Sequence, residues 1–163
     1  MVEREADGRE PSVRCINFGL DGMQSFSFTL EEERSAVLVP AGQVGTYLYE
    51  PNASVLKAGA FKQIAVRTGV KKLQVNSHLY TADHLVSDFP GRRFRVDEVL
   101  SFTGKLCKGL SKTIPQANIT VRNFPLSVEE LRKRTKITDG GHVYLFATTL
   151  VDGEKVLVKC SKA

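Results

Sequence analysis

The sequence predicts an α+β fold in which helices pack on one face of a mostly antiparallel sheet. From residue 93 onward, the apolar residues follow the order strand, helix, strand, helix, strand, strand. The dipeptides Asp21-Gly22 and Asp152-Gly153 each lie between two β-rich runs, where Asp-Gly is typical of a hairpin. A helical pattern over residues 53–68 precedes the alternating part of the chain.

The composition is that of a soluble globular protein. The 163 residues are 42% hydrophobic, which is enough to bury a core. No apolar run approaches the roughly 18 residues of a membrane span, and the polar segment MVEREADGREPS does not resemble a signal peptide. We therefore expect a cytoplasmic protein without membrane contact. Cys15, Cys107 and Cys160 are far apart in apolar surroundings, which predicts buried free thiols.

The formal net charge of +5 is unevenly distributed. Residues 1–50 carry 4 Lys or Arg against 9 Asp or Glu, a net charge of −5, whereas residues 51–163 carry 19 against 9, a net charge of +10. A basic part of this kind favours a polyanionic partner. A lysine-rich domain without such a partner is the alternative that composition leaves open.

The N-terminal part predicts a hairpin after an irregular segment. Residues 1–11 are highly charged and end at Pro11, which indicates a disordered or linker-like lead-in. Residues 13–18 and 24–29 predict two strands joined by Gly19-Leu20-Asp21-Gly22. An isolated hairpin is only marginally stable. These strands must therefore pack on the rest of this chain or on a neighbouring domain.

Residues 53–68 predict one continuous helix. Asn52 is a good N-cap, apolar residues recur at helical spacing, and Gly69 stands where a left-handed C-cap belongs. Residues 73–80 are predicted to be extended.

Residues 92–114 predict a strand followed by a short helix. Phe94 and Val96 alternate with Arg93 and Arg95, as in a half-buried strand. In the helix predicted over residues 105–114, three apolar residues fall on one side and three lysines on the other. These lysines are Lys105, Lys108 and Lys112, and no acidic residue accompanies them.

The remaining residues predict a strand, a well-defined helix and a hairpin. Residues 119–122 alternate as a strand, and Ser127 and Glu130 have the spacing of a capping box for a helix whose last turn is basic. The predicted hairpin has a type I′ turn and consists of residues 142–151, Asp152-Gly153 and residues 154–160.

Five segments resemble, in order, the C-terminal region of a family of bacterial class I S-adenosylmethionine-dependent methyltransferases. They are YLYEPNASVLKAGAFKQIA, NSHLY, DFPGRRFRV, ANITVRNFPLSVEELRKR and DGGHVYLFATTL. The resemblance covers residues 45–162 and implies a ferredoxin-like domain followed by a THUMP-like domain. The expected domains are residues 12–91 and 92–163, and residues 12–45 could instead be the tail of an upstream catalytic domain.

The resemblance also implies that the chain is part of a longer enzyme. Methyl transfer and S-adenosylmethionine would then belong to an upstream domain, and this chain would be non-catalytic with no cofactor of its own. The segment FGLDGMQSF is consistent with a catalytic site elsewhere. It lacks the G-x-G spacing of a nucleotide-binding turn, and it precedes a strand rather than a helix. By analogy with the THUMP domains of RNA-modifying enzymes, the resemblance implies RNA as the target.

The sequence gives little support for a metal site or for a catalytic nucleophile. His78, Asp83, His84 and Asp88 could be imagined around a metal, but their spacing matches no common ligand pattern. The three cysteines lack an adjacent histidine or a capping position that would activate a thiol.

The basic residues carry the main functional signal. The predicted nucleic-acid-binding residues are Lys71, Lys72, Arg93, Arg95, Lys105, Lys108, Lys112, Arg122, Arg132, Lys133 and Lys136. The basic helix end has a second explanation, because cations there interact favourably with the helix dipole by roughly 0.3–1 kcal/mol. Exposed rings beside cations could stack on RNA bases. The candidate rings are Tyr47, Tyr49, Tyr80 and Phe124.

Two hypotheses follow. In the first, these cations converge into one surface, and the chain is the RNA-recognition module of a methyltransferase. In the second, the chain is a structural module that docks on the catalytic domain or forms a homodimer, and the acidic first 50 residues pair with the basic remainder.

Overall fold

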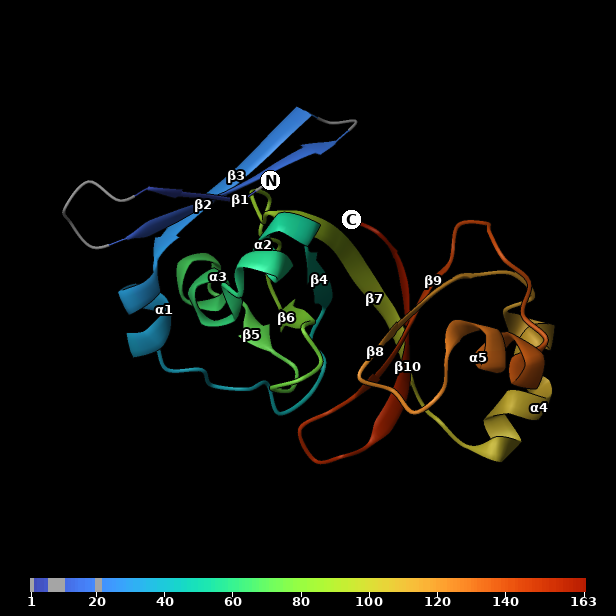
Figure 1. Cartoon of the computed structure of the whole chain (residues 1–163). Coiled ribbons are helices and arrows are strands. Elements are labelled where there is room, and N and C mark those ends of the chain that lie inside the picture. The colour runs from blue at the N-terminus through green and yellow to red at the C-terminus, as the bar shows by residue number, and fades with distance from the viewer. Residues whose placement is uncertain (1, 6–10, 20–21) are drawn as a thin grey trace.

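The computed structural model describes residues 2–5, 11–19 and 22–163, which form two sheets (Figure 1). The small sheet has the order β1-β2-β3, and the large, seven-stranded sheet has the order β5-β6-β4-β7-β10-β9-β8. The strands of the small sheet are β1 (Val2–Glu5), β2 (Ser12–Gly19) and β3 (Gly22–Thr29). The strands of the large sheet are β4 (Tyr47–Pro51), β5 (Lys71–Lys72), β6 (Tyr80–Ala82), β7 (Gly91–Ser101), β8 (Asn118–Arg122), β9 (Tyr144–Thr149) and β10 (Lys155–Lys162).

The helices form two groups at opposite ends of the molecule (Figure 1). One group lies near the small sheet, and the other lies at the far end of the large sheet. The first group is α1 (Leu30–Ser35), α2 (Ala53–Ala58) and α3 (Phe61–Thr68), and the second is α4 (Gly104–Thr113) and α5 (Val128–Thr135). In the described residues, no helix has both the length and the apolar character needed to cross a membrane.

The predicted N-terminal hairpin is confirmed and packs on this chain. Strands β2 and β3 pair antiparallel along their length, and Leu20 and Asp21 of the predicted turn lie outside the described residues. Four buried side chains of the hairpin share a core cluster with α2 and α3: Val13, Cys15, Phe26 and Phe28.

The expected lead-in over residues 1–11 differs from the structure. Residues 2–5 form β1, which pairs antiparallel with β2 from Val2 opposite Cys15 to Glu5 opposite Ser12. Met1 and residues 6–10 lie outside the described residues. A disordered or linker-like segment was predicted from the high charge and Pro11, but a short charged strand is stabilised by backbone hydrogen bonds to an available sheet edge.

The prediction of one helix over residues 53–68 is wrong. Gly59 has a φ of 74°, in the left-handed region, and caps the C-terminus of α2, and α3 begins after Ala60. A left-handed residue breaks the helical hydrogen-bond ladder, and glycine adopts this conformation without steric cost. The predicted caps at Asn52 and Gly69 are both present.

Helix α3 is capped by a residue far away in the sequence. Its N-cap residue, Ala60, has no side-chain acceptor. The carboxylate of Glu33 accepts hydrogen bonds from the backbone N–H groups of Lys62 and Gln63 instead, both at 2.8 Å. Glu33 lies in α1, so this short helix ties the end of the small sheet to α3.

We expect Glu33→Ala to lower the free energy of unfolding by about 1–2 kcal/mol, because it removes two charge-assisted hydrogen bonds from the start of a helix. Urea unfolding measures the change. Glu98→Ala, which removes an exposed carboxylate from β7, is the matched control and should change the free energy by less than about 0.5 kcal/mol. Equal effects of the two substitutions would contradict the capping role of Glu33.

The segment predicted to be extended over residues 73–80 is a strand only at Tyr80. Residues 73–79 form a loop between β5 and β6, in which His78 has a φ of 49°. The loop reaches the ends of β8 and β9, where the hydroxyl of Ser77 donates to the carbonyl oxygen of Thr149 at 2.8 Å. The segment was predicted to be extended, but the positive φ at His78 turns the chain back.

The helices α2 to α5 cover one face of the large sheet, as predicted. Tyr49 and Tyr80 face α2 and α3, and Leu145 and Leu157 belong to the core cluster under α4 and α5. We call this side the helix face. On the opposite face, a second core cluster includes Leu48, Leu73, Leu79, Phe94, Phe146 and Val158. The three cysteines are free and buried, as predicted.

The predicted order of elements from residue 93 onward is confirmed, and so is the capping box of Ser127 and Glu130. Strand β8 pairs with β9 in parallel, whereas the other paired strands of the large sheet are antiparallel. The predicted type I′ turn is wrong. Of Asp152 and Gly153, only Gly153 has a positive φ, 87°, and a three-residue loop joins Leu150 to Glu154.

Candidate nucleic-acid interface

Helix α4 exposes three lysines on the side that faces away from the sheet. Thr103 caps the helix by accepting a hydrogen bond from the N–H of Leu106 at 3.1 Å. Cys107 and Leu110 are buried against the core. The exposed lysines are Lys105, Lys108 and Lys112, and α4 contains no carboxylate. Within residues 2–5, 11–19 and 22–163, none of these three ammonium groups forms an ion pair.

The basic end of α5 lies in the same helix layer as α4 (Figure 1). Leu131 of α5 and Leu110 of α4 belong to one core cluster. Lys133, Arg134 and Lys136 are exposed at this end. We use the name α4–α5 basic face for the exposed cations of the two helices, which point in more than one direction around α5: Lys105, Lys108, Lys112, Lys133, Arg134 and Lys136.

Arg132 does not contribute to the α4–α5 basic face. Its Nη2 donates to the carboxylate of Asp139 at 2.9 Å and to the carbonyl oxygen of Ala117 at 3.2 Å, and its Nη1 donates to the carbonyl oxygen of Ile137 at 3.2 Å. The guanidinium group therefore fixes the chain after α5. This structural role differs from the predicted contact with nucleic acid.

Three predicted arginines lie elsewhere on the large sheet. Arg93 and Arg95 share the face of β7 opposite Phe94, as predicted, and this is the helix face. Arg93 Nη1 donates to the carbonyl oxygen of Ser87 at 2.7 Å. Arg122 is on the opposite face of the sheet, 3.2 Å from the carboxylate of Glu50. The sheet thus separates Arg122 from the α4–α5 basic face. The expected convergence of all the cations into one surface is wrong.

Lys72 is buried, so it does not lie on a binding surface as predicted. Its side chain is 2% exposed, and its Nζ donates to the carbonyl oxygen of Val75 at 2.6 Å. The ammonium group also lies 4.7 Å from the centre of the Phe61 ring. Burial lowers the pKa of Lys72 to about 8.

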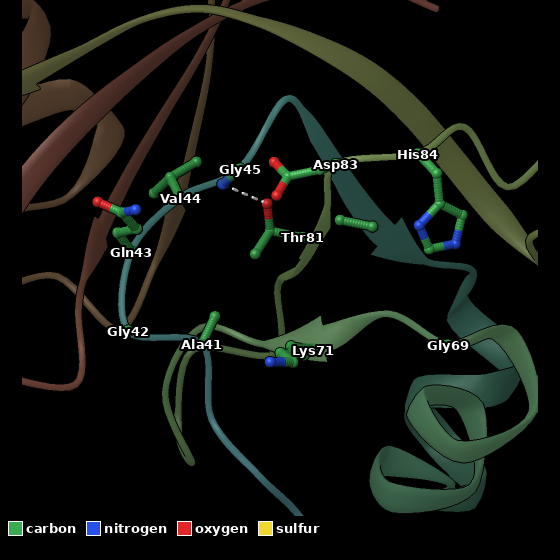
Figure 2. A pocket seen from close by; sticks show the side chains of 11 residues that line it. Ala41, Gly42, Gln43, Val44, Gly45, Gly69, Lys71, Thr81, Asp83 and His84 are labelled. Carbon is green, nitrogen blue, oxygen red and sulfur yellow. Dashed lines mark hydrogen bonds between the residues drawn. The ribbon is translucent and has the colours of Figure 1, made fainter.

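Lys71 is exposed beside a hollow of about 670 Å³ (Figure 2). Figure 2 shows Asp83 and His84 across the hollow from Lys71, and Gly42 to Gly45 along one side. Asp83 is already engaged, because its Oδ1 accepts a hydrogen bond from the backbone N–H of Thr46 at 3.1 Å. Among the described residues, no group of three His, Cys, Asp or Glu side chains could hold a metal ion.

Comparison with known proteins identifies both halves of the large sheet. Residues 47–90 match a family described as a ferredoxin-like domain, and residues 91–162 match one described as THUMP domain-like. The chain contains a ferredoxin-like domain followed by a THUMP-like domain. Strand β4 of the ferredoxin-like part pairs with β7 of the THUMP-like part, so one continuous sheet joins the two domains. The α4–α5 basic face belongs to the THUMP-like domain.

A solved structure shares most of this fold. The crystal structure of a proposed methyltransferase from Porphyromonas gingivalis W83 matches with a TM-score of 0.88 and 48% sequence identity. The match covers 92% of the present chain and 37% of the Porphyromonas chain. The present chain thus spans about a third of the length of the Porphyromonas protein. No curated protein matches the sequence.

The candidate stacking rings are mostly enclosed by the ferredoxin-like and THUMP-like domains. Tyr49 and Tyr80 are fully buried, and their hydroxyl groups donate to backbone carbonyl oxygens. Phe124 packs edge-on against Phe102, with 5.0 Å between ring centres. Tyr47 is half-buried. Tyr49 and Tyr80 are therefore core residues, in contrast to the prediction.

The carboxylates of α1 pair near the small sheet and not with the THUMP-like domain. Glu32 forms an ion pair with Arg67 at 2.6 Å, Glu31 forms one with Arg34 at 3.0 Å, and Glu33 caps α3. Glu32 thus pairs with the basic remainder of the chain, as the second hypothesis expects, and so does Glu50. Glu50 pairs with Arg92, which the sequence analysis did not select, and with Arg122.

Proposed function

We propose that this chain is the non-catalytic, RNA-binding substrate-recognition part of an S-adenosylmethionine-dependent methyltransferase. The α4–α5 basic face supports this proposal most directly. It presents six exposed cations on a THUMP-like domain, and α4 has no acidic residue among its three lysines. Lysines of this kind bind the phosphates of RNA without regard to sequence.

Methyl transfer is assigned to the remainder of the longer protein. The structural match to a proposed methyltransferase, which extends over 37% of that protein, supports this assignment. One segment of this chain, FGLDGMQSF, contains glycines that could suggest a cofactor-binding turn. The candidate segment around Gly19 and Gly22 connects two paired strands of a hairpin, whereas a nucleotide-binding turn leads from a strand into a helix.

RNA binding by a variant without the three α4 lysines tests the proposal. We expect K105S/K108S/K112S to bind a structured or single-stranded RNA at least about tenfold more weakly than the unmodified chain at low salt, because three phosphate contacts are lost. Fluorescence anisotropy with a labelled RNA measures the affinity. The variant should unfold at the same urea concentration, since all three side chains are exposed.

A second triple variant controls for the loss of net charge. K57S/K155S/K159S removes the same charge from the ferredoxin-like domain and from β10. It should retain nearly the affinity of the unmodified chain. Equal losses in both variants would contradict a specific role for α4, and undetectable binding of the unmodified chain at low salt would contradict RNA binding altogether.

One observation favours a second function, docking on the rest of the longer protein or dimerisation. Phe18 and Met23 face each other across β2 and β3, and they are 69% and 55% exposed. An exposed apolar pair at one end of a hairpin favours contact with another protein surface. For a homodimer, sedimentation should show an association that F18S/M23S weakens, with RNA binding unaffected.

A further inference from the structure

A buried carboxylate on β4 holds two arginine side chains at a cleft between the large sheet, the β2–β3 hairpin and the start of α2. Glu50 is 7% exposed. Its Oε1 accepts hydrogen bonds from Arg92 Nε at 3.1 Å and Arg92 Nη2 at 2.8 Å. Its Oε2 lies 3.2 Å from Nη2 of Arg122. One carboxylate therefore forms two hydrogen bonds with one guanidinium group and an ion pair with a second.

The fold brings these three residues together from distant strands. Glu50 and Arg92 are opposite each other in β4 and β7. Arg122 comes from β8, which is separated from β4 by three strands in the sheet order, so the sheet must curl strongly to bring them together. Gly91 permits the close approach of β7 to β4, because a side chain at position 91 would collide with the carbonyl oxygen of Glu50.

The two guanidinium groups keep donors that the protein does not use. The side chain of Arg92 is 50% exposed and that of Arg122 is 38% exposed, against 10% for Glu50. Arg92 commits Nε and Nη2 to Glu50, and Arg122 commits Nη1 to the carbonyl oxygen of Val121. Glu50 Oε2 receives no aligned hydrogen bond, although it is buried. Each arginine has five N–H donors, so several remain for a ligand.

The cleft has the size and the charge to hold an anion. Its volume is about 440 Å³, within the range of small-molecule sites. Its described lining contains Glu50, Arg92 and Arg122 as the charged residues, which leaves a net charge of +1. The amides of Asn17, Gln24 and Asn52 also line it. The Arg92 guanidinium is further held over the Phe94 ring, 5.2 Å from its centre.

We propose that Arg92 and Arg122 bind the phosphate group of a nucleoside monophosphate or of an RNA 5′ end in this cleft. Arginine forks bind phosphate oxygens in pairs, and a carboxylate behind them orients both forks in advance. Asn52 is engaged, because it caps α2 and donates to the amide oxygen of Gln24, so the Asn17 amide and the Gln24 amide nitrogen are the groups that face the sugar and base. The site is separate from the α4–α5 basic face, because β7 and β8 carry these arginines on the opposite side of the sheet. It does not depend on the proposed role of α4.

NMR of the arginine Nε–Hε groups tests the site on the unmodified chain. During titration with uridine 5′-monophosphate, the signals of Arg92 and Arg122 should shift and saturate together, and the signal of Arg95 should not move. Uridine without a phosphate should produce no such shift. Absence of a saturable shift at millimolar nucleotide, or equal shifts at Arg95, would overturn the proposal.

Substitutions give the second measurement. R92Q and R122Q should each weaken binding of uridine 5′-monophosphate by about tenfold, because each removes a charged, two-point contact. R95Q is the matched control on β7 and should bind as the unmodified chain does. Unchanged affinity in R92Q and R122Q would refute the site.

Two RNA oligonucleotides distinguish the sources of the phosphate. If an RNA end is the ligand, an oligonucleotide with a 5′ phosphate should bind more tightly than the same oligonucleotide without it, and R122Q should abolish the difference. If a free nucleotide is the ligand, the two oligonucleotides should bind equally while uridine 5′-monophosphate still saturates the site. K105S/K108S/K112S should leave nucleotide binding unchanged in either case, so a failure of the RNA proposal does not affect this result.

Discussion

Phe94→Ala is expected to lower the free energy of unfolding by about 3–5 kcal/mol, the cost of deleting a buried aromatic ring. Phe94 is 1% exposed and lies at the centre of the core opposite the helices. Its ring packs against Tyr144 and Phe146, with ring centres 5.0 Å and 4.9 Å away. It also supports the guanidinium group of Arg92. The ring thus joins β7 to β9 and to the arginine cleft.

Urea unfolding followed by circular dichroism measures this loss. Phe94→Leu should cost clearly less, about 1–2 kcal/mol, because it keeps most of the buried apolar volume. Phe18→Ala removes an exposed ring and should change stability by less than about 0.5 kcal/mol. A loss in Phe94→Ala no larger than that in Phe18→Ala would show that this core does not hold the large sheet together.

The second large effect that we expect is a dependence of the free energy of unfolding on pH, which arises from Lys72. Burial lowers its pKa to about 8 from the usual 10.5, although Glu33 acts in the opposite direction. In the unfolded chain Lys72 keeps its proton up to the higher pKa, so between these two values the unfolded state binds more protons than the folded state. The free energy of unfolding contributed by Lys72 therefore rises with pH across this window, by about 3 kcal/mol in total.

Comparison with Lys72→Met isolates this contribution, because methionine has a similar length and no charge. Buried groups with raised pKa values, among them Tyr80 and Cys160, favour unfolding at alkaline pH, but both proteins contain them. From neutral pH to about pH 11, the unmodified protein should gain about 3 kcal/mol relative to Lys72→Met. Parallel pH profiles of the two proteins would contradict the burial of a charged Lys72.

The features that the sequence predicted correctly depend on residues close together in the chain. The capping box of Ser127 and Glu130 spans three residues, and its hydrogen bonds form within one helical turn. The side of α4 that bears the lysines follows from the 100° turn per residue. The helical period of residues 53–68 was also correct, but a glycine inside such a period does not reveal whether it breaks the helix.

The missed features depend on partners that are distant in sequence. Helix α1 was not predicted, because the acidic run Glu31–Glu33 resembles a loop until Arg67 and the start of α3 are placed beside it. Lys72 was selected for its charge, but its surroundings are set by the fold of the loop after β5. Arg92 and Arg122 meet at Glu50 only because of the strand order and the curl of the sheet. Periodicity contains no information on that order.

The candidate interface was predictable in part, namely where its residues are close together in the chain. The three α4 lysines lie on one helix, so their common exposure could be inferred from spacing. The basic end of α5 was ambiguous, because a cation there can stabilise the helix dipole or bind a ligand. In the structure, the cations at this end of α5 have different roles. Arg132 is paired with Asp139, and the neighbouring cations are exposed.

The salt dependence of RNA binding tests the central claim, that the α4 lysines neutralise RNA phosphates, most directly. A plot of log affinity against log salt concentration should be linear for the unmodified chain. For K105S/K108S/K112S, the slope should be shallower by about 2–3, since each phosphate contact contributes roughly 0.7–0.9 to it. K57S/K155S/K159S should retain the slope of the unmodified chain. Identical slopes for the unmodified chain and K105S/K108S/K112S would contradict the claim.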